Sequence, residues 1–256
     1  MPKKRDVRSP LKKRALRVPG QSLAASIDEL VNDKLFFWVL APMVFVMFAV
    51  FDWYRAAFNA PPRPWISTSM ALLVILLSVW RIGSLRRTVR HMRQGLEGER
   101  VVGQVLESLR ASGYEVLHDI PGDGHNVDHV LIGPSGVFAI ETKTISKPKG
   151  DHHVVFDGKS VTVAGLRPDR DPVAQVKAAA TEVRTIIQDR AGLELPVRPV
   201  LLYPGWFTEN GGKHDLWVLN ENALPKFLAS EAVRLSDAQI RQVSTAIARH
   251  VWDVDS

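Results

Sequence analysis

The sequence predicts a membrane-anchored α/β protein, in which a transmembrane helical hairpin precedes a mixed sheet flanked by helices. Two long uncharged runs lie near the N-terminus, and from about residue 95 short β segments alternate with helical segments. A chain of 256 residues is long enough for one domain of usual size and a substantial further segment. We therefore expect four parts: a basic tail over 1–34, the hairpin over 35–85, a linker helix over 86–94 and the α/β domain over 95–256.

Charge is distributed unevenly along the chain. Residues 1–98 hold 16 Lys and Arg against 6 Asp and Glu, whereas residues 99–256 hold 17 against 21. A membrane surface explains the first surplus, and the second part has no global positive field to attract DNA, so that DNA binding there needs a local basic patch. The chain has no cysteine, which excludes disulfides, thiolate zinc sites and cysteine nucleophiles.

Residues 1–20 contain eight Lys and Arg, two interior prolines and little apolar periodicity. This composition predicts a disordered basic tail. We interpret it as a solvated cytoplasmic flank, and the alternative is an arm that binds nucleic acid.

The two uncharged runs have the length and flanks of membrane spans. Leu35–Phe51 has 17 residues without a charge, and Trp65–Trp80 has 16, with Trp at or near their ends. Nine Lys and Arg precede the first run and five follow the second, which predicts that both termini and the α/β domain are cytoplasmic. We expect a multi-pass protein of the cell (inner) membrane, and the 34 residues before the first run argue against a secretory signal peptide.

The α/β domain is expected to open with a helix from Glu99 to Ser112, after a break in the preceding helix at Gly95 and Gly98. Residue types and turn signals then predict the following elements: strands at 115–119, 128–133, 137–144, 154–156, 160–163, 197–203 and 216–219, and helices at 171–190, 223–229 and 237–251.

The segment 126–144 consists of two apolar runs around Gly-Pro-Ser-Gly at 133–136, a pattern that predicts a β-hairpin. A turn centred on that tetrapeptide places Asp128 opposite Glu141. Facing residues have Cβ atoms about 5 Å apart, and side chains alternate between the faces of a strand, so Lys143 shares a face with Glu141. We therefore expect the three charged side chains at one place.

Two facing carboxylates repel each other, and a divalent cation relieves that repulsion. Mg²⁺ or Mn²⁺ suits carboxylate and water oxygens, and such an ion can activate water at a phosphodiester. Lys143 would then orient the water or neutralise the phosphate. The alternative interpretation is a solvated ion network at one end of a hairpin.

Further motifs surround this group in a fixed order: Gly95-x-x-Gly98-Glu99, Asp128-His129-Val130, Gly136-Val-Phe-Ala-Ile-Glu141-x-Lys143 and Asp171-Pro-Val-Ala-Gln175. Over residues 95–188 this order resembles the NERD (nuclease-related) domain. The resemblance implies a restriction-endonuclease-like α/β core, in the branch that is similar to Mrr-type and Holliday-junction-resolving enzymes.

Carried onto this sequence, the resemblance implies that Asp128 and Glu141 are metal ligands and that Lys143 is the catalytic lysine. It also implies that Glu99 is an auxiliary acid and that Gln175 is a polar residue beside the site. Simpler interpretations exist for the last two, because an acid favours the first turn of a helix and Gln175 suits an exposed helix surface.

After Lys143 the sequence departs from the usual family pattern, with Thr-Ile-Ser at 144–146 in place of an Asn- and Gly-rich continuation. The basic loop that follows predicts contacts with a phosphate backbone through Lys147, Lys149 and His152. Histidines 125, 129, 152 and 153 lack the spacing of a metal site, so we expect structural roles for them.

Two functions from different classes follow. The first is a Mg²⁺-dependent endonuclease that hydrolyses DNA at the inner face of the membrane, with DNA and the lipid bilayer as partners. The second is a membrane-tethered module that binds nucleic acid or protein with negligible catalysis, which the net charge of −4 over residues 99–256 favours. A Gly-rich phosphate loop and a Gly-x-Ser-x-Gly elbow are both missing, which argues against an ATPase or an α/β-hydrolase.

Overall fold

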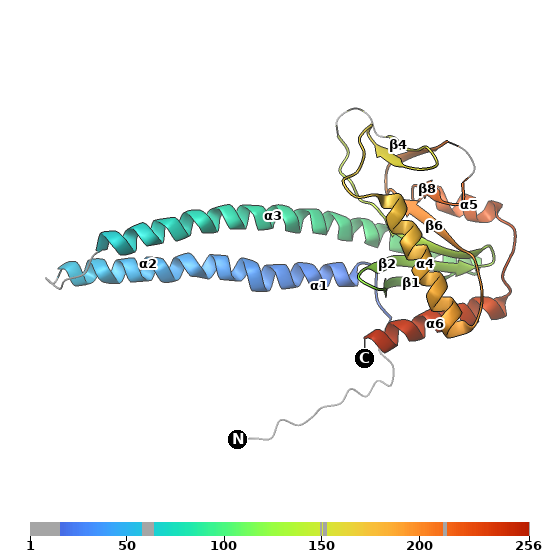
Figure 1. The fold of residues 1–256 in the computed structure, drawn as a ribbon, viewed down its shortest axis with the longest axis horizontal. Helices are drawn as coiled ribbons and strands as arrows, with labels where there is room; N and C mark the ends of the chain where they lie inside the picture. The colour runs from blue at the N-terminus through green and yellow to red at the C-terminus, as the bar shows by residue number, and fades with distance from the viewer. Residues whose placement is uncertain (1–15, 58–63, 149, 151–152, 212–213, 256) are drawn as a thin grey trace, which may run out of the picture. The chain divides into compact units, whose positions relative to one another are not determined.

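In a computed structural model of the chain, the described residues are 16–57, 64–148, 150, 153–211 and 214–255 (Figure 1). They divide into two compact units. One unit is Ser22–Leu96, and the other combines the chain from Glu97 onward with the described residues before Ser22.

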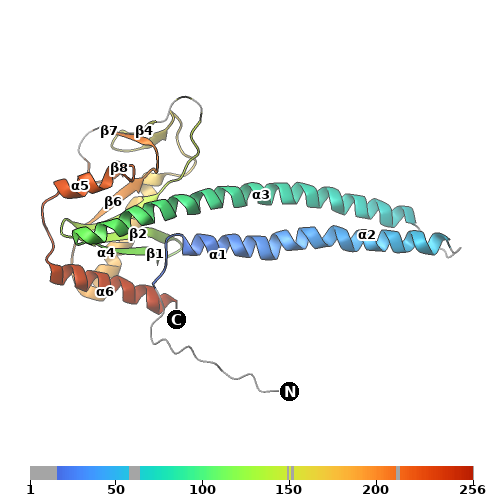
Figure 2. The ribbon, with the colours of Figure 1, turned by 180° about the vertical axis from the view of Figure 1, so that it is seen from behind.

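The first unit is a pair of long helices. Helix α1 (Gln21–Glu29), a π-helical segment (Leu30–Leu35) and α2 (Phe36–Ala57) follow one another without a break, and α3 begins at Pro64. The two arms run side by side in both views (Figures 1 and 2). Near the end of α2 and the start of α3, the rings of Trp53 and Trp65 meet edge to face, and Trp53 Nε1 donates a hydrogen bond to Thr68 Oγ1 at 3.0 Å.

Both arms of this pair are long and apolar enough to cross a membrane, by length and composition. The stretches that meet this criterion are Gln21–Ala57 and Pro64–Ser112. Only a small share of their most apolar windows is buried, so most of these apolar side chains are not covered by other residues that the structure describes.

Helix α3 continues to Ser108, and the break predicted at Gly95 and Gly98 is therefore wrong. A glycine in a helix costs only about 1 kcal/mol relative to alanine, which the neighbouring turns absorb. The helix ends as expected further on, through a 3₁₀ turn (Leu109–Ser112) and Gly113 in the left-handed conformation at φ 82°.

The α/β unit is built on a five-stranded sheet in the order β1-β2-β3-β6-β8. Strands β1, β2 and β3 are antiparallel neighbours, whereas β6 lies parallel to β3 and β8 lies parallel to β6. The strands are β1 (Glu115–Pro121), β2 (Asn126–Gly133), β3 (Gly136–Thr142), β6 (Val197–Leu202) and β8 (Trp217–Leu219). The predicted mixed sheet with flanking helices is confirmed.

A second sheet of three strands has the order β5-β4-β7. It contains β4 (His153–Phe156), β5 (Val161–Val163) and β7 (Phe207–Asn210). The sequence did not predict β7, because Phe-Thr-Glu-Asn has no apolar alternation and its side chains remain largely exposed.

Helices cover both faces of the larger sheet. On one face, α4 (Pro172–Ala191) and α6 (Asp237–Val254) contribute buried residues such as Val183 and Ile247. On the other face, the core includes Val102 and Leu106 of α3 together with residues of α5 (Leu224–Ser230). Both of the helices α4 and α6 have N-caps, since the side chains of Asp171 and Ser236 accept hydrogen bonds from their first turns.

The register predicted for the β2–β3 hairpin is confirmed over its paired length. Leu131 lies opposite Phe138, and Gly133 lies opposite Gly136. The last pair is His129 with Ile140, so Asp128 stands one position beyond the ladder, where the strands are joined by a side chain instead.

Candidate active site

Asp128 connects β2 to β3 through its carboxylate. Its Oδ2 accepts a hydrogen bond from the backbone N–H of Thr142 at 2.7 Å. The side chain replaces a ladder bond at the point where strand pairing ends. The carboxylate is thereby fixed beside the last residues of β3.

Glu141 and Lys143 form an ion pair at the same end of β3. Lys143 Nζ lies 2.6 Å from Glu141 Oε1, and the two side chains are 25% and 13% exposed. The backbone N–H of Lys143 donates to the carbonyl of Leu202 at 2.8 Å, which ties this end of β3 to β6. The predicted proximity of Glu141 and Lys143 is therefore confirmed, whereas their chemical roles stay predictions.

Negative charge accumulates here beyond what one lysine offsets. The pKa of Asp128 is raised well above its usual range, first by burial and then by the charges of Glu141 and Glu99. The Thr142 N–H and the Lys143 ammonium oppose this rise. A cation bound among these carboxylates would therefore stabilise their ionised forms.

Glu99 lies on α3 and interacts electrostatically with this group. Burial, followed by the charges of Asp119 and Glu141, raises the pKa of Glu99 to about 7. The sequence predicted Glu99 as a member of the site, and a Cβ on the preceding Gly98 would lie 1.6 Å from Thr144 Oγ1, so this turn of α3 packs directly against the end of β3. The role of auxiliary acid remains a prediction.

Asp119 is a further acid of this region that the sequence did not identify. It lies on β1 between His118 and Ile120, in the register position that faces Asp128, and it is 4% exposed. Its backbone is left-handed at φ 52°, an uncommon conformation outside glycine. The local sequence around Asp119 does not indicate that this acid is buried, because an acid near the end of a strand is usually solvated.

Arg17 explains how Asp119 is tolerated. Its Nη1 donates to the Asp119 carbonyl at 3.2 Å and lies 3.4 Å from Oδ2, while its Nε donates to Asp255 at 3.0 Å. Asn126 Nδ2 donates to the other carboxylate oxygen of Asp119 at 3.0 Å. The expectation that residues 1–20 are a solvated tail is therefore wrong at Arg17, because two acids distant in sequence bind it.

Three buried polar atoms lie at the ends of β3 and β6. Thr142 Oγ1, Thr144 Oγ1 and the Tyr203 hydroxyl have no hydrogen-bond partner among the described residues. Burial, and then the charge of Glu141, raises the pKa of Tyr203. Unpartnered polar atoms inside a protein are costly, so this end of the sheet is suited to a bound water or ligand oxygen.

For the remaining predicted site residues, the structure shows no hydrogen bond or ion pair with Asp128, Glu141 or Lys143 among the described residues. Gln175 lies half-buried on α4, and its side chain forms no hydrogen bond with any described residue. Lys147 Nζ lies 5.9 Å from the centre of the Trp206 ring, whereas Lys149 and His152 are outside the described residues. The structure thus brings Glu99, Asp128, Glu141 and Lys143 together and leaves the others as predictions.

His129 belongs to a buried chain of side chains on the α3 face of the sheet. Its Nδ1 lies 2.9 Å from Nδ1 of His118, whose Nε2 lies 2.9 Å from Glu107. Burial lowers the pKa of both histidines, which keeps them neutral near pH 7. This environment agrees with the structural role expected for His129.

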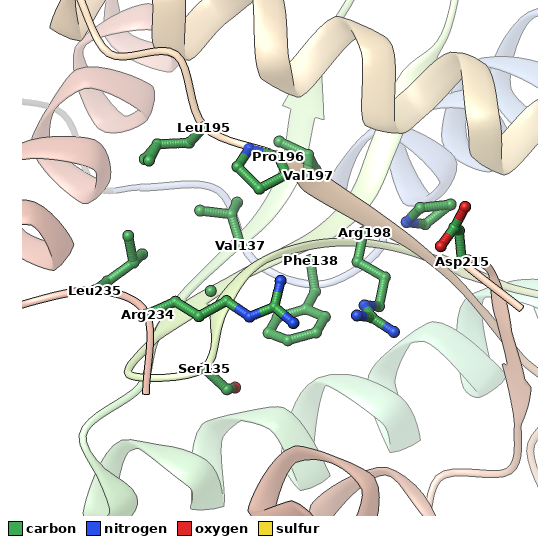
Figure 3. A pocket seen from close by; sticks show the side chains of 12 residues that line it. Ser135, Val137, Phe138, Leu195, Pro196, Val197, Arg198, Asp215, Arg234 and Leu235 are labelled. Carbon is green, nitrogen blue, oxygen red and sulfur yellow. The ribbon is translucent and has the colours of Figure 1, made fainter. Parts of the chain in front are cut away.

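A cavity of about 280 Å³ lies at the opposite end of β3 (Figure 3). Phe138 lines it, and the side chains of Arg198 and Arg234 are both bound to Glu231, at 3.5 and 3.0 Å. Asp215 also lines it. Because acids balance these arginines, the cavity offers no surplus charge and is separate from the Asp128 group.

Asp128 and Glu141 are the predicted donors for a magnesium-type ion. Within the described part of the chain, no group of three or more His, Asp or Glu side chains is arranged to hold a metal. Mg²⁺ commonly uses one or two carboxylates and completes its shell with water and phosphate oxygens. Asp128 and Glu141 each commit one oxygen to the protein bonds described above, so each retains another for an ion.

Glu99 gives the site a testable pH dependence. Since its pKa is raised from 4.5 to about 7, the folded state holds the proton more tightly than the unfolded state. Its contribution to stability is complete below about pH 4.5 and is lost as the pH rises through about 7. Each pKa unit corresponds to about 1.4 kcal/mol, so Glu99→Gln should stabilise the protein by up to about 3 kcal/mol at pH 8.

Unfolding of the full chain in detergent and EDTA, followed against pH, measures this difference. The stabilisation by Glu99→Gln should shrink as the pH falls from 8 to 5. A constant difference between the two proteins across that range would contradict the burial and charge coupling of Glu99.

A mixed α/β domain with two carboxylates and a lysine gathered at one end of a hairpin fits a nuclease-like domain. Residues 94–204 match the family model of NERD, the nuclease-related domain. This match supports the resemblance to the NERD family that the sequence motifs indicated. The matched region includes all five residues predicted as catalytic.

A stretch of 55 residues is also 38% identical to an uncharacterized protein of Bacillus anthracis. The similarity covers 20% of this chain and 26% of that relative. No solved structure matches the chain.

Proposed function

We propose that this protein is a membrane-anchored, metal-dependent nuclease that hydrolyses phosphodiester bonds of DNA at the cytoplasmic face of the cell membrane. The observation that carries the proposal is the convergence of Asp128, Glu141 and Lys143 inside the region that matches the nuclease-related domain. The α/β unit would be a restriction-endonuclease-like core.

Asp128 and Glu141 would hold Mg²⁺ or Mn²⁺. When bound, such an ion lowers the pKa of a water molecule and neutralises charge that develops on the phosphate. The excess of carboxylates over cationic groups at this end of the sheet supports an ion there, because an ion would offset both the burial and the repulsion from Glu141 and Glu99 that raise the pKa of Asp128.

The protein's own groups orient the site. The Thr142 N–H fixes the Asp128 carboxylate, and the ion pair with Glu141 holds the Lys143 ammonium at the same end of β3. From there the ammonium can neutralise a phosphate oxygen or orient a water molecule. Glu99, with a pKa of about 7, can hold or release a proton near neutral pH.

The substrate contacts belong to the same proposal. Lys147, Lys149 and His152 would touch the phosphate backbone, and Gln175 would be a polar residue beside the site. The net charge of residues 99–256 is −4, so such local contacts would have to provide the attraction for DNA.

The test uses the full chain in detergent with supercoiled and linear DNA. Cleavage should require Mg²⁺ or Mn²⁺ and stop with EDTA, and calorimetry without DNA should detect binding of the ion. A protein that binds neither ion and leaves both DNA forms intact would contradict the enzymatic proposal.

A second candidate is a tethered interaction module that binds nucleic acid or protein without turnover. The sparse donor set favours it, since no group of three metal-binding side chains occurs in the described ranges. The ion pair between Glu141 and Lys143 also satisfies both charges without a metal. Binding of DNA without metal-dependent cleavage in the same assay would select this candidate.

Membrane anchoring is proposed on three observations. Both arms of the helical pair are long and apolar enough to span a membrane, and their apolar side chains are largely exposed. The basic flanks would face the cytoplasm. Trp65 and Trp80, which are 72% and 69% exposed, have the character of interfacial anchors.

Topology can be measured by reporter fusions to the chain. A fusion after Gly95 should report a cytoplasmic position, and a fusion within 56–62 should report the opposite side of the membrane. Carbonate extraction should leave the wild-type chain in the membrane fraction. A cytoplasmic signal from both fusions would contradict the hairpin topology.

A further inference from the structure

A groove of about 380 Å³ runs between the two arms of the helical unit, near the ends of the apolar stretches. It lies where the predicted transmembrane hairpin over 35–85 begins, at Leu35, and where it ends, at Leu85. Its walls are apolar side chains from both arms and three arginines from α3: Leu30, Val31, Leu35, Leu85, Val89, Arg86, Arg90 and Arg93.

The three arginines lie on one face of α3. Their spacings of four and three residues bring successive side chains to the same side of a helix. All three are exposed, and none forms an ion pair with a carboxylate of the described residues. The nearby acids Asp28, Glu29 and Asp33 are exposed and do not line the groove. The positive charge in the groove is therefore not neutralised by an ion pair among the described residues.

We propose that this groove binds an anionic phospholipid, with its phosphate head group on Arg86, Arg90 and Arg93 and an acyl chain along the leucine and valine side chains. The inference rests on the proposed membrane anchoring. An apolar wall continuous with three unpaired cations matches a lipid better than a soluble anion, because it covers both parts of an amphiphile. Basic residues at the cytoplasmic end of membrane helices are placed to meet anionic head groups.

The charge of the lipid should decide the affinity. Each basic residue at a membrane surface strengthens binding of anionic lipid by about fivefold. Phosphatidylglycerol should therefore bind the purified full chain more tightly than phosphatidylcholine. Removing two of the three charges, as in Arg86→Gln/Arg90→Gln, should weaken phosphatidylglycerol binding by roughly 20- to 30-fold.

A matched control is available on the same helix. Arg81 and Arg87 are also exposed, but they do not line the groove. Arg81→Gln/Arg87→Gln removes the same charge, and it should change the affinity much less. Native mass spectrometry of the detergent-solubilised chain, titrated with each lipid, counts the retained molecules and gives the affinities.

Two results would overturn the proposal. Equal losses in the two double variants would mean that the basic flank acts only as a diffuse field, and equal affinities for the two lipids would mean that the arginines do not select the head group. Carbonate extraction of every variant separates this outcome from a failure of anchoring. The DNA cleavage assay is independent of both measurements.

Discussion

Glu141→Gln should reduce metal-dependent DNA cleavage by about 100-fold or more and should weaken binding of Mn²⁺ in calorimetry. The amide can still accept a hydrogen bond from Lys143, so the packing at the end of β3 is kept while the negative charge is lost. Asp128→Asn should act in the same way, although its bond with the Thr142 N–H also positions the strand end.

The control for these variants is Glu97→Gln. Glu97 is exposed on α3 two residues before Glu99, so this change removes one negative charge nearby and leaves the site untouched. It should cleave DNA at the wild-type rate. An equal loss in Glu97→Gln, or full activity in Glu141→Gln, would argue against a metal held by Glu141.

Lys143→Met distinguishes the binding of the metal ion from the catalytic role of the Lys143 ammonium. Removing the ammonium frees the Glu141 oxygen that it occupies, so affinity for the ion should be kept or should rise, while cleavage should fall by about 100-fold. In a solvated ion network, by contrast, neither Glu141→Gln nor Lys143→Met would change an affinity for metal.

The register of the β2–β3 hairpin was predictable because it depends on local chemistry. A Gly-Pro-Ser-Gly turn between two apolar runs fixes which residues face each other, and the structure has Leu131 opposite Phe138 as expected. That register placed Asp128 and Glu141 near one another before any long-range contact was considered.

The residues that surround Asp128 and Glu141 in the folded protein were not predictable, because they come from distant parts of the chain. Arg17 and Asp119 are 102 residues apart, and no periodicity connects them. The charge of Glu141 likewise acts on Tyr203 only because β6, which ends just before Tyr203, lies parallel to β3 in the folded sheet. The prediction of a helix break at Gly98 was wrong for a related reason. Glycine at this position allows α3 to pack closely against Thr144, and helix propensity carries no information about such a tertiary contact.

Gly98→Ala should destabilise the α/β unit by about 1–3 kcal/mol and should also reduce cleavage. A Cβ on Gly98 would lie 1.6 Å from Thr144 Oγ1, 2.8 Å from its Cβ and 3.0 Å from its Cγ2. Rotation of Thr144 relieves only part of this overlap, so α3 must move away from the end of β3. Glu99 follows Gly98 directly and would move with the helix.

Two comparisons isolate the contact, with thermal unfolding and DNA cleavage of the full chain as readouts. Gly95→Ala, on the same helix, brings a Cβ no closer than 3.4 Å to Leu23, so it should be neutral or stabilising by up to about 1 kcal/mol. Thr144→Ala should restore part of the lost stability in the Gly98→Ala background, because it removes the two atoms beyond Cβ. Wild-type stability and cleavage in Gly98→Ala alone would mean that α3 does not approach Thr144 closely, and the placement of Glu99 beside Glu141 would then lose its support.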